Sequence, residues 1–412
     1  MIKIFHGAPT VKPSRDLLSR DREGAVLSII NSIRHEGDSA LLRYACELDG
    51  LGDQPLRVSE DELAKAASAL CPEVRRAVET AICNIRQFAK EQLPRERFEE
   101  FAPGRKLGWI VRPLDAVGCY VPSGRYPLPS TLLMTAVLAQ TAGVPRICVT
   151  SPRPSREILA CAHMLGIREV YRVGGAQAIA ALAFGTETIP RVDRIVGPGN
   201  AYVAAAKKLL AGEVGIDFIA GPTEILILAA GGDPKIIAAD MLAQAEHDPA
   251  ARAMFITTSP ELANAVSAEI ERQLENLPTA EIARQSIDGS SFIIVAPDMN
   301  TAVKISNEIA PEHLSLHDAG LLPKIRNAGT VFLGSNSPES AGDYAAGPSH
   351  VLPTNGVARL RGGLSATDFV KVIAIQQLSP YALRELAPAI TTLARAEGLE
   401  AHARAVEVRS VN

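Results

Sequence analysis

Residues 169–203 read EVYRVGGAQAIAALAFGTETIPRVDRIVGPGNAYV and contain two short strand patterns, each followed by a glycine turn and a helical pattern. The first strand pattern, 169–173, is rich in Val and Tyr and leads into the small-residue helix AQAIAALAFG. The second, 193–196, leads through GPGN into a helical segment at 201–210. Strands that alternate with helices in this way form right-handed βαβ units, so we predict a parallel sheet.

The same alternation continues on both sides of this stretch. Towards the N-terminus we expect strands at 116–121 and 146–150 and helices at 130–142 and 155–165. After Gly221 the pattern resumes, with strands at 224–229, 253–257, 291–295 and 330–333 and helices at 234–244, 261–274 and 299–309. The sequence therefore predicts an α/β protein with two doubly wound blocks, at about 115–222 and 223–335.

Both ends of the chain are predicted to be helical. Within the first 110 residues, 16–34 and 59–90 carry apolar residues at helical spacing among charges. After Asp368 we expect helices at 368–377 and 379–398.

Composition excludes several classes of protein. The 412 residues contain 42 Lys and Arg against 46 Asp and Glu, a net charge of -4, which argues against a nucleic-acid-binding face. No apolar run approaches the roughly 20 residues of a membrane helix, and MIKIFHGAPT does not resemble a secretory signal. The six cysteines form no CxxC pair, which is typical of reduced thiols in a cytoplasmic protein.

Glycine turns follow or flank the predicted strands. Ligands bind beyond the carboxyl ends of strands in open parallel sheets, and we assign PSGRYPLPS, GGAQ, GPGN and GPTE to those ends. A dinucleotide is plausible there, because glycines admit close backbone approach and helix N-termini offer free N–H groups. However, Val203 stands where the third glycine of the dinucleotide fingerprint would be, so simple strand termination is an equally good interpretation.

Three local clusters contain histidine with a polar or acidic neighbour. Gln244 and His247 are three residues apart at the end of a predicted helix, and Glu312 and His313 are adjacent in a predicted loop. Asp343 is followed by His350 in a small-residue stretch after the strand TVFLG, which places it at the ligand-binding edge of the sheet. Seen alone, the first two pairs are more often surface groups, and the third is the strongest local hint of a site.

The ordered set of motifs resembles the histidinol dehydrogenase family, which catalyses the last two steps of histidine biosynthesis. The similarity runs from about residue 20 to the C-terminus. The motifs are GCYVP-SGRYPLPST, the 173–203 segment quoted above, GPTEILILA, QAEHD, NEIAPEHL, GTVFLG, SPESAGDYAAGPSHVLPT, GGLS-TDF and AEGLEAHARAV.

The resemblance implies one Zn²⁺ per protomer, with ligands from both subunits of a homodimer. The implied ligands are Gln244, His247 and Asp343, together with His402 of the partner subunit, which alone would be read as a surface histidine. Glu312 and His313 match the catalytic pair, as water activator and general base. The implied substrate-binding positions are Ser130, Thr223, Gln244, His247, His313, Asp343, His350, Glu397 and His402, and the NAD-contacting positions are Tyr120, Gln177 and Asn200.

The implied reaction is the four-electron oxidation of L-histidinol to L-histidine by two NAD⁺ through bound L-histidinaldehyde. The implied architecture has two incomplete Rossmann-like domains. The expected domains are an N-terminal helical region (1–115) that packs with the second α/β domain, an NAD-side domain (116–222), a metal and catalytic domain (223–365), and a helical tail (366–412) that reaches the partner. Ser123 stands where the family often has glycine, and the N-terminal arm is short.

Three other functions stay open. The same scaffold can oxidise another small alcohol, such as a sulfonated polyol, for which Arg359 and Arg361 are candidate sulfonate contacts. A glutamate-activated water beside zinc is also the chemistry of a zinc hydrolase. The third is a two-lobed α/β ligand-binding protein, which the Glu312–His313 pair disfavours.

Overall fold

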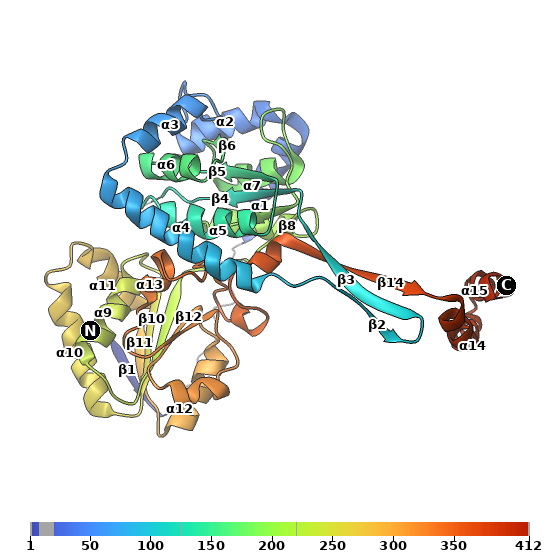
Figure 1. The fold of residues 1–412 in the computed structure, drawn as a ribbon. Helices are drawn as coiled ribbons and strands as arrows, with labels where there is room; N and C mark the ends of the chain where they lie inside the picture. Colours follow the sequence, from blue (N-terminus) through green and yellow to red (C-terminus); the bar gives the residue numbers. More distant parts are fainter. Residues whose placement is uncertain (1, 8–19, 125, 220, 411–412) are drawn as a thin grey trace. The chain divides into compact units, whose positions relative to one another are not determined.

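The computed structural model describes residues 2–7, 20–124, 126–219 and 221–410 (Figure 1). The chain divides into two compact units, one of Met1–Gln92 with Asp115–Phe369 and a smaller one of Leu93–Leu114 with Val370–Asn412. Within the described ranges, no helix combines the length and the apolar character needed to cross a bilayer.

The larger unit contains two parallel sheets, of which the first confirms the predicted βαβ units. Its strand order is β6-β5-β4-β7-β8, and every neighbouring pair is parallel. The strands are β4 (Ala116–Tyr120), β5 (Arg146–Thr150), β6 (Glu169–Tyr171), β7 (Arg194–Val196) and β8 (Gly215–Ile216). The helices that follow strands β4 to β7 are α5 (Pro129–Thr141), α6 (Arg156–Met164), α7 (Gly175–Phe184) and α8 (Ala201–Leu210).

The second sheet has six parallel strands in the order β1-β11-β10-β9-β12-β13. They are β1 (Lys3–His6), β9 (Glu224–Leu228), β10 (Arg252–Thr257), β11 (Phe292–Val295), β12 (His313–Leu316) and β13 (Thr330–Leu333). One face packs on α9 (Pro234–Ala245), α10 (Pro260–Leu274) and α11 (Ala280–Gly289), and the other on α12 (Met299–Ile309). Strand β9 reads EILIL and is wholly buried, as expected for a parallel strand covered on both faces.

The N-terminal helices are α1 (Arg20–Glu36), α2 (Asp38–Asp49), α3 (Glu60–Ser68) and α4 (Pro72–Gln92). The predicted segment 59–90 is two helices, since Pro72 has no N–H to donate and begins a new helix. Helices α1 and α2 pack in one buried cluster with α7 and α8 of the first sheet, which differs from the predicted packing on the second domain. Two other N-terminal contacts do reach the second domain. Strand β1 pairs with β11, and the Asn84 side chain in α4 donates a hydrogen bond of 2.9 Å to the Ala345 carbonyl.

The smaller unit has an antiparallel sheet in the order β14-β3-β2 and two helices. Its elements are β2 (Arg97–Ala102), β3 (Arg105–Pro113), β14 (Val370–Leu378), α14 (Pro380–Ala396) and α15 (Glu400–Ser410). The predicted helix at 368–377 is therefore wrong over 370–377. These residues read VKVIAIQQ, and β-branched alternation favours a strand once β3 supplies the partner. The β2–β3 hairpin in the predicted helical region was also missed.

The two parallel sheets present opposite ends of their strands to the candidate site. The first sheet offers carboxyl ends, where GGAQ follows β6 and GPGN follows β7. The second offers amino ends, because Thr223 directly precedes β9 and Glu312 directly precedes β12. Helix α9, which begins beyond the carboxyl end of β9, runs back towards this amino edge. The expectation that GPTE and Asp343 lie at carboxyl ends is wrong. GPTE leads into β9, and the helix α13 (Glu339–Tyr344) returns Asp343 to the amino end of β12.

A buried ion pair holds the GPGN turn after β7 through hydrogen bonds to its backbone. Lys207 Nζ donates to Asp217 Oδ1 at 2.7 Å and to the Gly197 carbonyl, and Asp217 Oδ2 accepts from the Gly197 N–H at 2.8 Å. Both side chains are buried, so each charge depends on the other to offset its desolvation. The pair therefore fixes the backbone of the turn that carries Asn200.

Candidate active site

Glu312 and His313 stand where β12 enters the second sheet. The backbone of β12 lies between β9 and β13, so His313 is the first residue of an interior strand and Glu312 directly precedes it. Glu312 Oε2 accepts hydrogen bonds from Thr223 Oγ1 at 2.6 Å and from the Glu224 N–H at 2.8 Å. These two donors fix the orientation of the buried Glu312 carboxylate.

The His313 ring is held at one nitrogen and free at the other. Nδ1 lies 3.1 Å from the Glu224 carbonyl oxygen, and the ring stacks on Phe332 with centroids 5.9 Å apart. A carbonyl oxygen only accepts, so this contact places a proton on Nδ1. Nε2 is buried without a hydrogen-bond partner, and the Asp343 Oδ1 atom, 3.7 Å away, is too far for one. The free nitrogen is therefore available to a reacting group.

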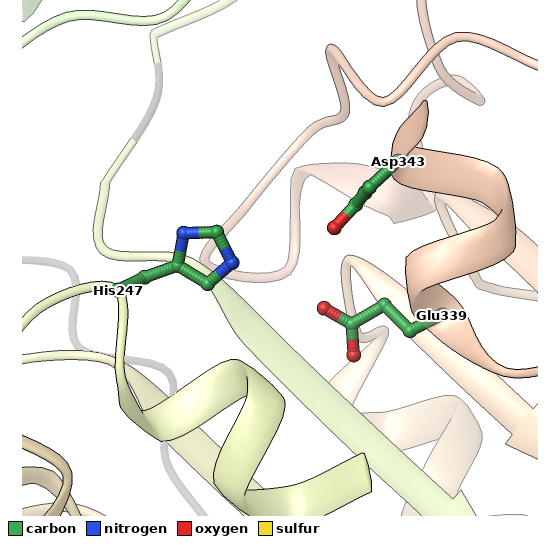
Figure 2. A group of neighbouring side chains, drawn as sticks. All are labelled: His247, Glu339 and Asp343. Atoms are coloured by element: carbon green, nitrogen blue, oxygen red, sulfur yellow. The ribbon is translucent and has the colours of Figure 1, made fainter. Parts of the chain in front are cut away.

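The candidate metal ligands come from α9 and α13. Gln244 lies in the last turn of α9 and His247 just beyond it, while Asp343 lies on α13. Figure 2 shows the His247 ring facing the carboxyl groups of Asp343 and Glu339, and potential ligand atoms of these three residues lie within 4.8 Å of one another. Sequence reasoning missed Glu339. Its four-residue spacing from Asp343 in ESAGD was the available signal, because that spacing places both on one helix face.

Buried negative charge is concentrated in this cluster. Burial raises the pKa of Glu339 to about 8 and also raises the pKa of Glu312. For His313, burial disfavours the imidazolium, but the carboxylates of Glu339, Glu312 and Asp343 outweigh it and raise the pKa to about 10. Buried carboxylates that share one imidazole need further positive charge nearby. The donor set of imidazole, carboxylate and amide oxygen fits a zinc ion.

A cavity of about 180 Å³ joins this cluster to the first sheet. Its lining includes Ser130 and Thr131 from α5, Thr223, Glu312, His313, His247, Asp343 and His350. His350 is held between the two domains, with Nδ1 2.9 Å from the Asp343 carbonyl oxygen and Nε2 3.2 Å from Thr131 Oγ1. The structure thus brings seven of the predicted residues to one cavity, namely Ser130, Thr223, His247, Glu312, His313, Asp343 and His350, whereas Gln244, Tyr120, Gln177 and Asn200 do not line it. Thr131, which the sequence analysis did not single out, links the two domains there.

The predicted NAD-contacting residues lie at the carboxyl edge of the first sheet. Tyr120 ends β4 and its hydroxyl accepts from the Gly175 N–H at 3.2 Å, while Asn200 caps α8 by accepting from the Tyr202 and Val203 N–H groups. Gln177 is buried and its Nε2 donates to Asp49 Oδ2 at 3.0 Å. The same Asp49 oxygen accepts from the Gly174 N–H, so an N-terminal helix steadies the GGAQ turn.

Glu397 and His402 belong to the smaller unit. Glu397 is the C-cap residue of α14, and His402 lies in the first turn of α15. Their proposed contacts with the metal and the substrate stay predictions.

Comparison with known proteins identifies the family. A sequence profile of histidinol dehydrogenase matches residues 13–410. Histidinol dehydrogenase from Geobacillus kaustophilus is 46% identical over 99% of this chain and 98% of its own, and that from Rhizobium meliloti is 47% identical over 95% and 93%. The crystal structure of histidinol dehydrogenase from Elizabethkingia anophelis superposes with a TM-score of 0.94 at 37% identity, covering 99% of this chain and 98% of that one.

The chain belongs to the histidinol dehydrogenase family. Membership confirms the resemblance drawn from the motifs, the α/β fold class and the prediction of an oxidoreductase. In this structure, Glu312, His313, His247 and Asp343 line one cavity.

Gly329 permits the close approach of β13 to Glu312. A Cβ atom on Gly329 would lie 2.5 Å from the Glu312 carbonyl oxygen, whereas one on Gly362 would meet no atom nearer than 3.6 Å. We predict that Gly329→Ala displaces Glu312 and His313 and lowers the turnover number of the dehydrogenase about 10- to 100-fold, while Gly362→Ala changes it less than about twofold. Steady-state kinetics of the two purified variants test this, and equal activities would contradict it.

Proposed function

We propose that this chain is a zinc-dependent histidinol dehydrogenase that converts L-histidinol to L-histidine with two NAD⁺ through bound L-histidinaldehyde. The observation that carries the proposal is the free, buried Nε2 of His313 beside Glu312, in the same cavity as His247 and Asp343. The family relationship supports the substrate, since the relatives named above are histidinol dehydrogenases.

Gln244, His247 and Asp343 of one protomer, with His402 of the partner subunit, would hold one Zn²⁺. When bound, the ion would act as a redox-inert Lewis acid that anchors the imidazole and amine of the substrate. The concentration of buried carboxylates around His313 supports this assignment, because a divalent cation would offset charge that the chain itself does not balance.

His313 would act as general base towards the substrate hydroxyl. Its Nδ1–H donates to the Glu224 carbonyl, so the lone pair of the neutral ring is at Nε2, which is the nitrogen without a partner. The carboxylates that raise the pKa of this ring are those that a bound cation would offset. Metal binding would therefore favour the neutral ring that a base requires.

Glu312 would deprotonate the water that attacks the bound aldehyde. Thr223 and Glu224 both donate to Oε2, so we assign Oε1 to the water. Burial raises the pKa of this carboxyl, which makes its anion a stronger base than a solvent-exposed glutamate. The hydrate would then deliver the second hydride.

NAD would bind at the carboxyl edge of the first sheet, near Tyr120, Gln177 and Asn200. Hydride chemistry belongs to this cofactor, and the protein supplies orientation. In this proposal the domain at 116–222 carries NAD, the domain at 223–365 carries the metal and catalytic groups, and the tail at 366–412 reaches the partner in a cytoplasmic homodimer. Ser130, Thr223, His350 and Glu397 would contact the substrate.

The structure disfavours a sulfonated polyol as substrate. Arg361 pairs with Asp368 at 2.6 Å and donates to the Asp217 carbonyl at 3.1 Å, and Arg359 donates to the Glu308 carbonyl. Both candidate sulfonate contacts are therefore engaged with the protein itself.

The decisive assay uses the purified, zinc-loaded full chain with L-histidinol and NAD⁺. We expect two NADH per histidine formed, loss of at least about 99% of the rate after chelation, and recovery on adding Zn²⁺. Substrate hydrolysis without NADH would indicate the hydrolase alternative, and release of the aldehyde with one NADH would contradict the four-electron reaction.

The two half-reactions separate the role of Glu312. We predict that Glu312→Gln, which keeps the side-chain shape and loses the base, slows oxidation of L-histidinaldehyde about 100-fold or more and slows the alcohol step much less. Stopped-flow NADH formation from each substrate measures both rates. Equal losses in the two steps would rule out the assignment of Glu312 to water activation.

Mixed dimers test whether the active site is shared. His247→Ala and His402→Ala lie on different sides of the proposed interface, so a heterodimer of the two variants would have one intact zinc site and one doubly damaged site. We expect each homodimer to be nearly inactive and the purified heterodimer to recover about half of the wild-type activity per dimer. No recovery in the heterodimer would show that His402 does not serve the partner's site.

A further inference from the structure

Glu224 is a buried acidic residue to which neither the motif analysis nor the proposed mechanism assigns a role for its side chain. It is the first residue of β9 and is 0% exposed. Burying a carboxylate is costly unless it is paired and hydrogen-bonded, so its contacts in this position require an explanation. The backbone and the side chain of Glu224 contact different parts of the structure.

The backbone of Glu224 holds both members of the Glu312–His313 pair. Its N–H donates to Glu312 Oε2 at 2.8 Å, and its carbonyl oxygen lies 3.1 Å from His313 Nδ1. One residue therefore orients the carboxyl group and also supplies the acceptor that places a proton on Nδ1. A shift of the Glu224 backbone would displace both groups together.

The side chain of Glu224 is held by two other segments of the chain. Arg252, its neighbour in register on β10, donates to Oε2 at 3.2 Å, and the Asn355 N–H donates to Oε1 at 3.1 Å. Asn355 follows Thr354, which lines the cavity. Burial raises the pKa of the Glu224 carboxyl to about 7, and the Arg252 guanidinium limits that rise. The charge of Glu224 therefore depends on Arg252.

The Glu224 side chain lies on the opposite face of the second sheet from the His313 ring. Along β9, Ile225 packs in the cluster with α9 and Leu226 in the cluster with α12, so alternation places Glu224 on the α12 side. Along β12, Leu314 packs on the α12 side, which places His313 on the α9 side. The carboxyl group of Glu224 therefore acts on the His313 ring through the backbone.

We propose that Glu224 is a positioning residue, whose carboxylate anchors the start of β9 to Arg252 and Asn355. Anchored in this way, its backbone keeps Glu312 and His313 in place for proton transfer. This inference rests on the proposed function, in which those two residues carry the proton transfers. The rate of such a step depends steeply on geometry, and a displacement of about 1 Å can lower it roughly 100-fold.

Direct proton exchange by Glu224 is the competing explanation, because a buried carboxyl with a pKa of about 7 can also act as an acid or a base. The two explanations differ in what an amide can replace. A glutamine cannot exchange a proton, but it can accept from the Asn355 N–H and donate to a second glutamine at position 252. Positioning therefore survives a paired change to two amides, whereas proton exchange does not.

A double-mutant cycle separates the two explanations. Turnover numbers with L-histidinol and NAD⁺ are measured on the zinc-loaded full-length chain for wild type, Glu224→Gln, Arg252→Gln and the double variant. Each single change leaves a buried group without its partner, so we expect each to lower the turnover number about 10-fold or more. In the double variant the two amides pair, and we expect turnover within about threefold of wild type. No recovery in the double variant would overturn the proposal.

Two controls show whether the loss is one of positioning. The Glu224 carboxyl bonds to Arg252 and Asn355 rather than to a proposed zinc ligand or NAD contact, so the KM for NAD⁺ and the zinc Kd of the single variants should stay within about threefold of wild type. Glu271→Gln removes an ion pair of 2.7 Å with Arg284 in the same domain, and it should leave turnover within about twofold. A loss there as large as in Glu224→Gln would contradict a specific role for Glu224.

A nuclear magnetic resonance measurement tests the inference without enzyme activity. In the full-length chain labelled with ¹⁵N-histidine, the Nδ1–H proton of His313 is identified by its loss in His313→Gln. The hydrogen bond to the Glu224 carbonyl slows exchange of this proton with water. We expect Glu224→Gln to speed the exchange about 10-fold or more and the double variant to restore it. Unchanged exchange in Glu224→Gln would overturn the proposal.

The proton-exchange measurement also distinguishes this inference from the proposed function. A wild-type chain that does not oxidise histidinol, but whose variants show the expected exchange pattern, would refute the function and leave the role of Glu224 intact. An active wild-type chain whose turnover and proton exchange are unaltered by Glu224→Gln would refute the role of Glu224 alone. Thermal unfolding identifies any variant that does not fold, and if Glu224→Gln does not, Arg252→Gln and the double variant carry the same test.

Discussion

The candidate active site is organised by buried carboxyl groups around one buried imidazole. Glu312 Oε2 and Glu339 Oε1 lie 3.7 and 3.9 Å from His313 Nδ1, and Asp343 Oδ1 lies 3.7 Å from Nε2. Charges this close are tolerated in a low-dielectric interior only when positive charge or hydrogen bonds offset them. The backbone N–H and hydroxyl donors on Glu312 supply part of that offset, and the proposed cation would supply the rest.

The fold supplies the rigidity that such an arrangement needs. Glu312 and His313 lie where the interior strand β12 begins, and Thr223 and Glu224 lie beside them at the start of β9. Helices α9 and α13 bring Gln244, His247, Glu339 and Asp343 to the same edge. Groups held by a parallel sheet and its helices keep their positions, so a bound cation would meet a preformed set of acidic and imidazole groups.

The two domains divide the chemistry between them. The first sheet presents glycine turns at its carboxyl edge, where the Lys207–Asp217 pair and Asp49 hold GPGN and GGAQ. These turns offer backbone groups, which suit a cofactor. The second sheet presents acidic and imidazole side chains at its amino edge, which suit a metal and proton transfer. The cavity between these edges is lined by Pro198 of the GPGN turn on one side and by Glu312, His313, His247 and Asp343 on the other.

The sequence by itself determined the alternation of strands and helices between residues 116 and 333 and, through its ordered motifs, the family. Local patterns carry this information, because strand and helix periods and glycine turns depend on neighbouring residues. Only the tertiary structure decided that VKVIAIQQL is a strand, because its partner β3 lies more than 250 residues away. It also decided that the second sheet uses its amino edge and that Glu339 faces His247 and Asp343, since both depend on how α9 and α13 return over the sheet. A side chain's role at a buried site follows from which distant groups pack against it, and no local pattern encodes that.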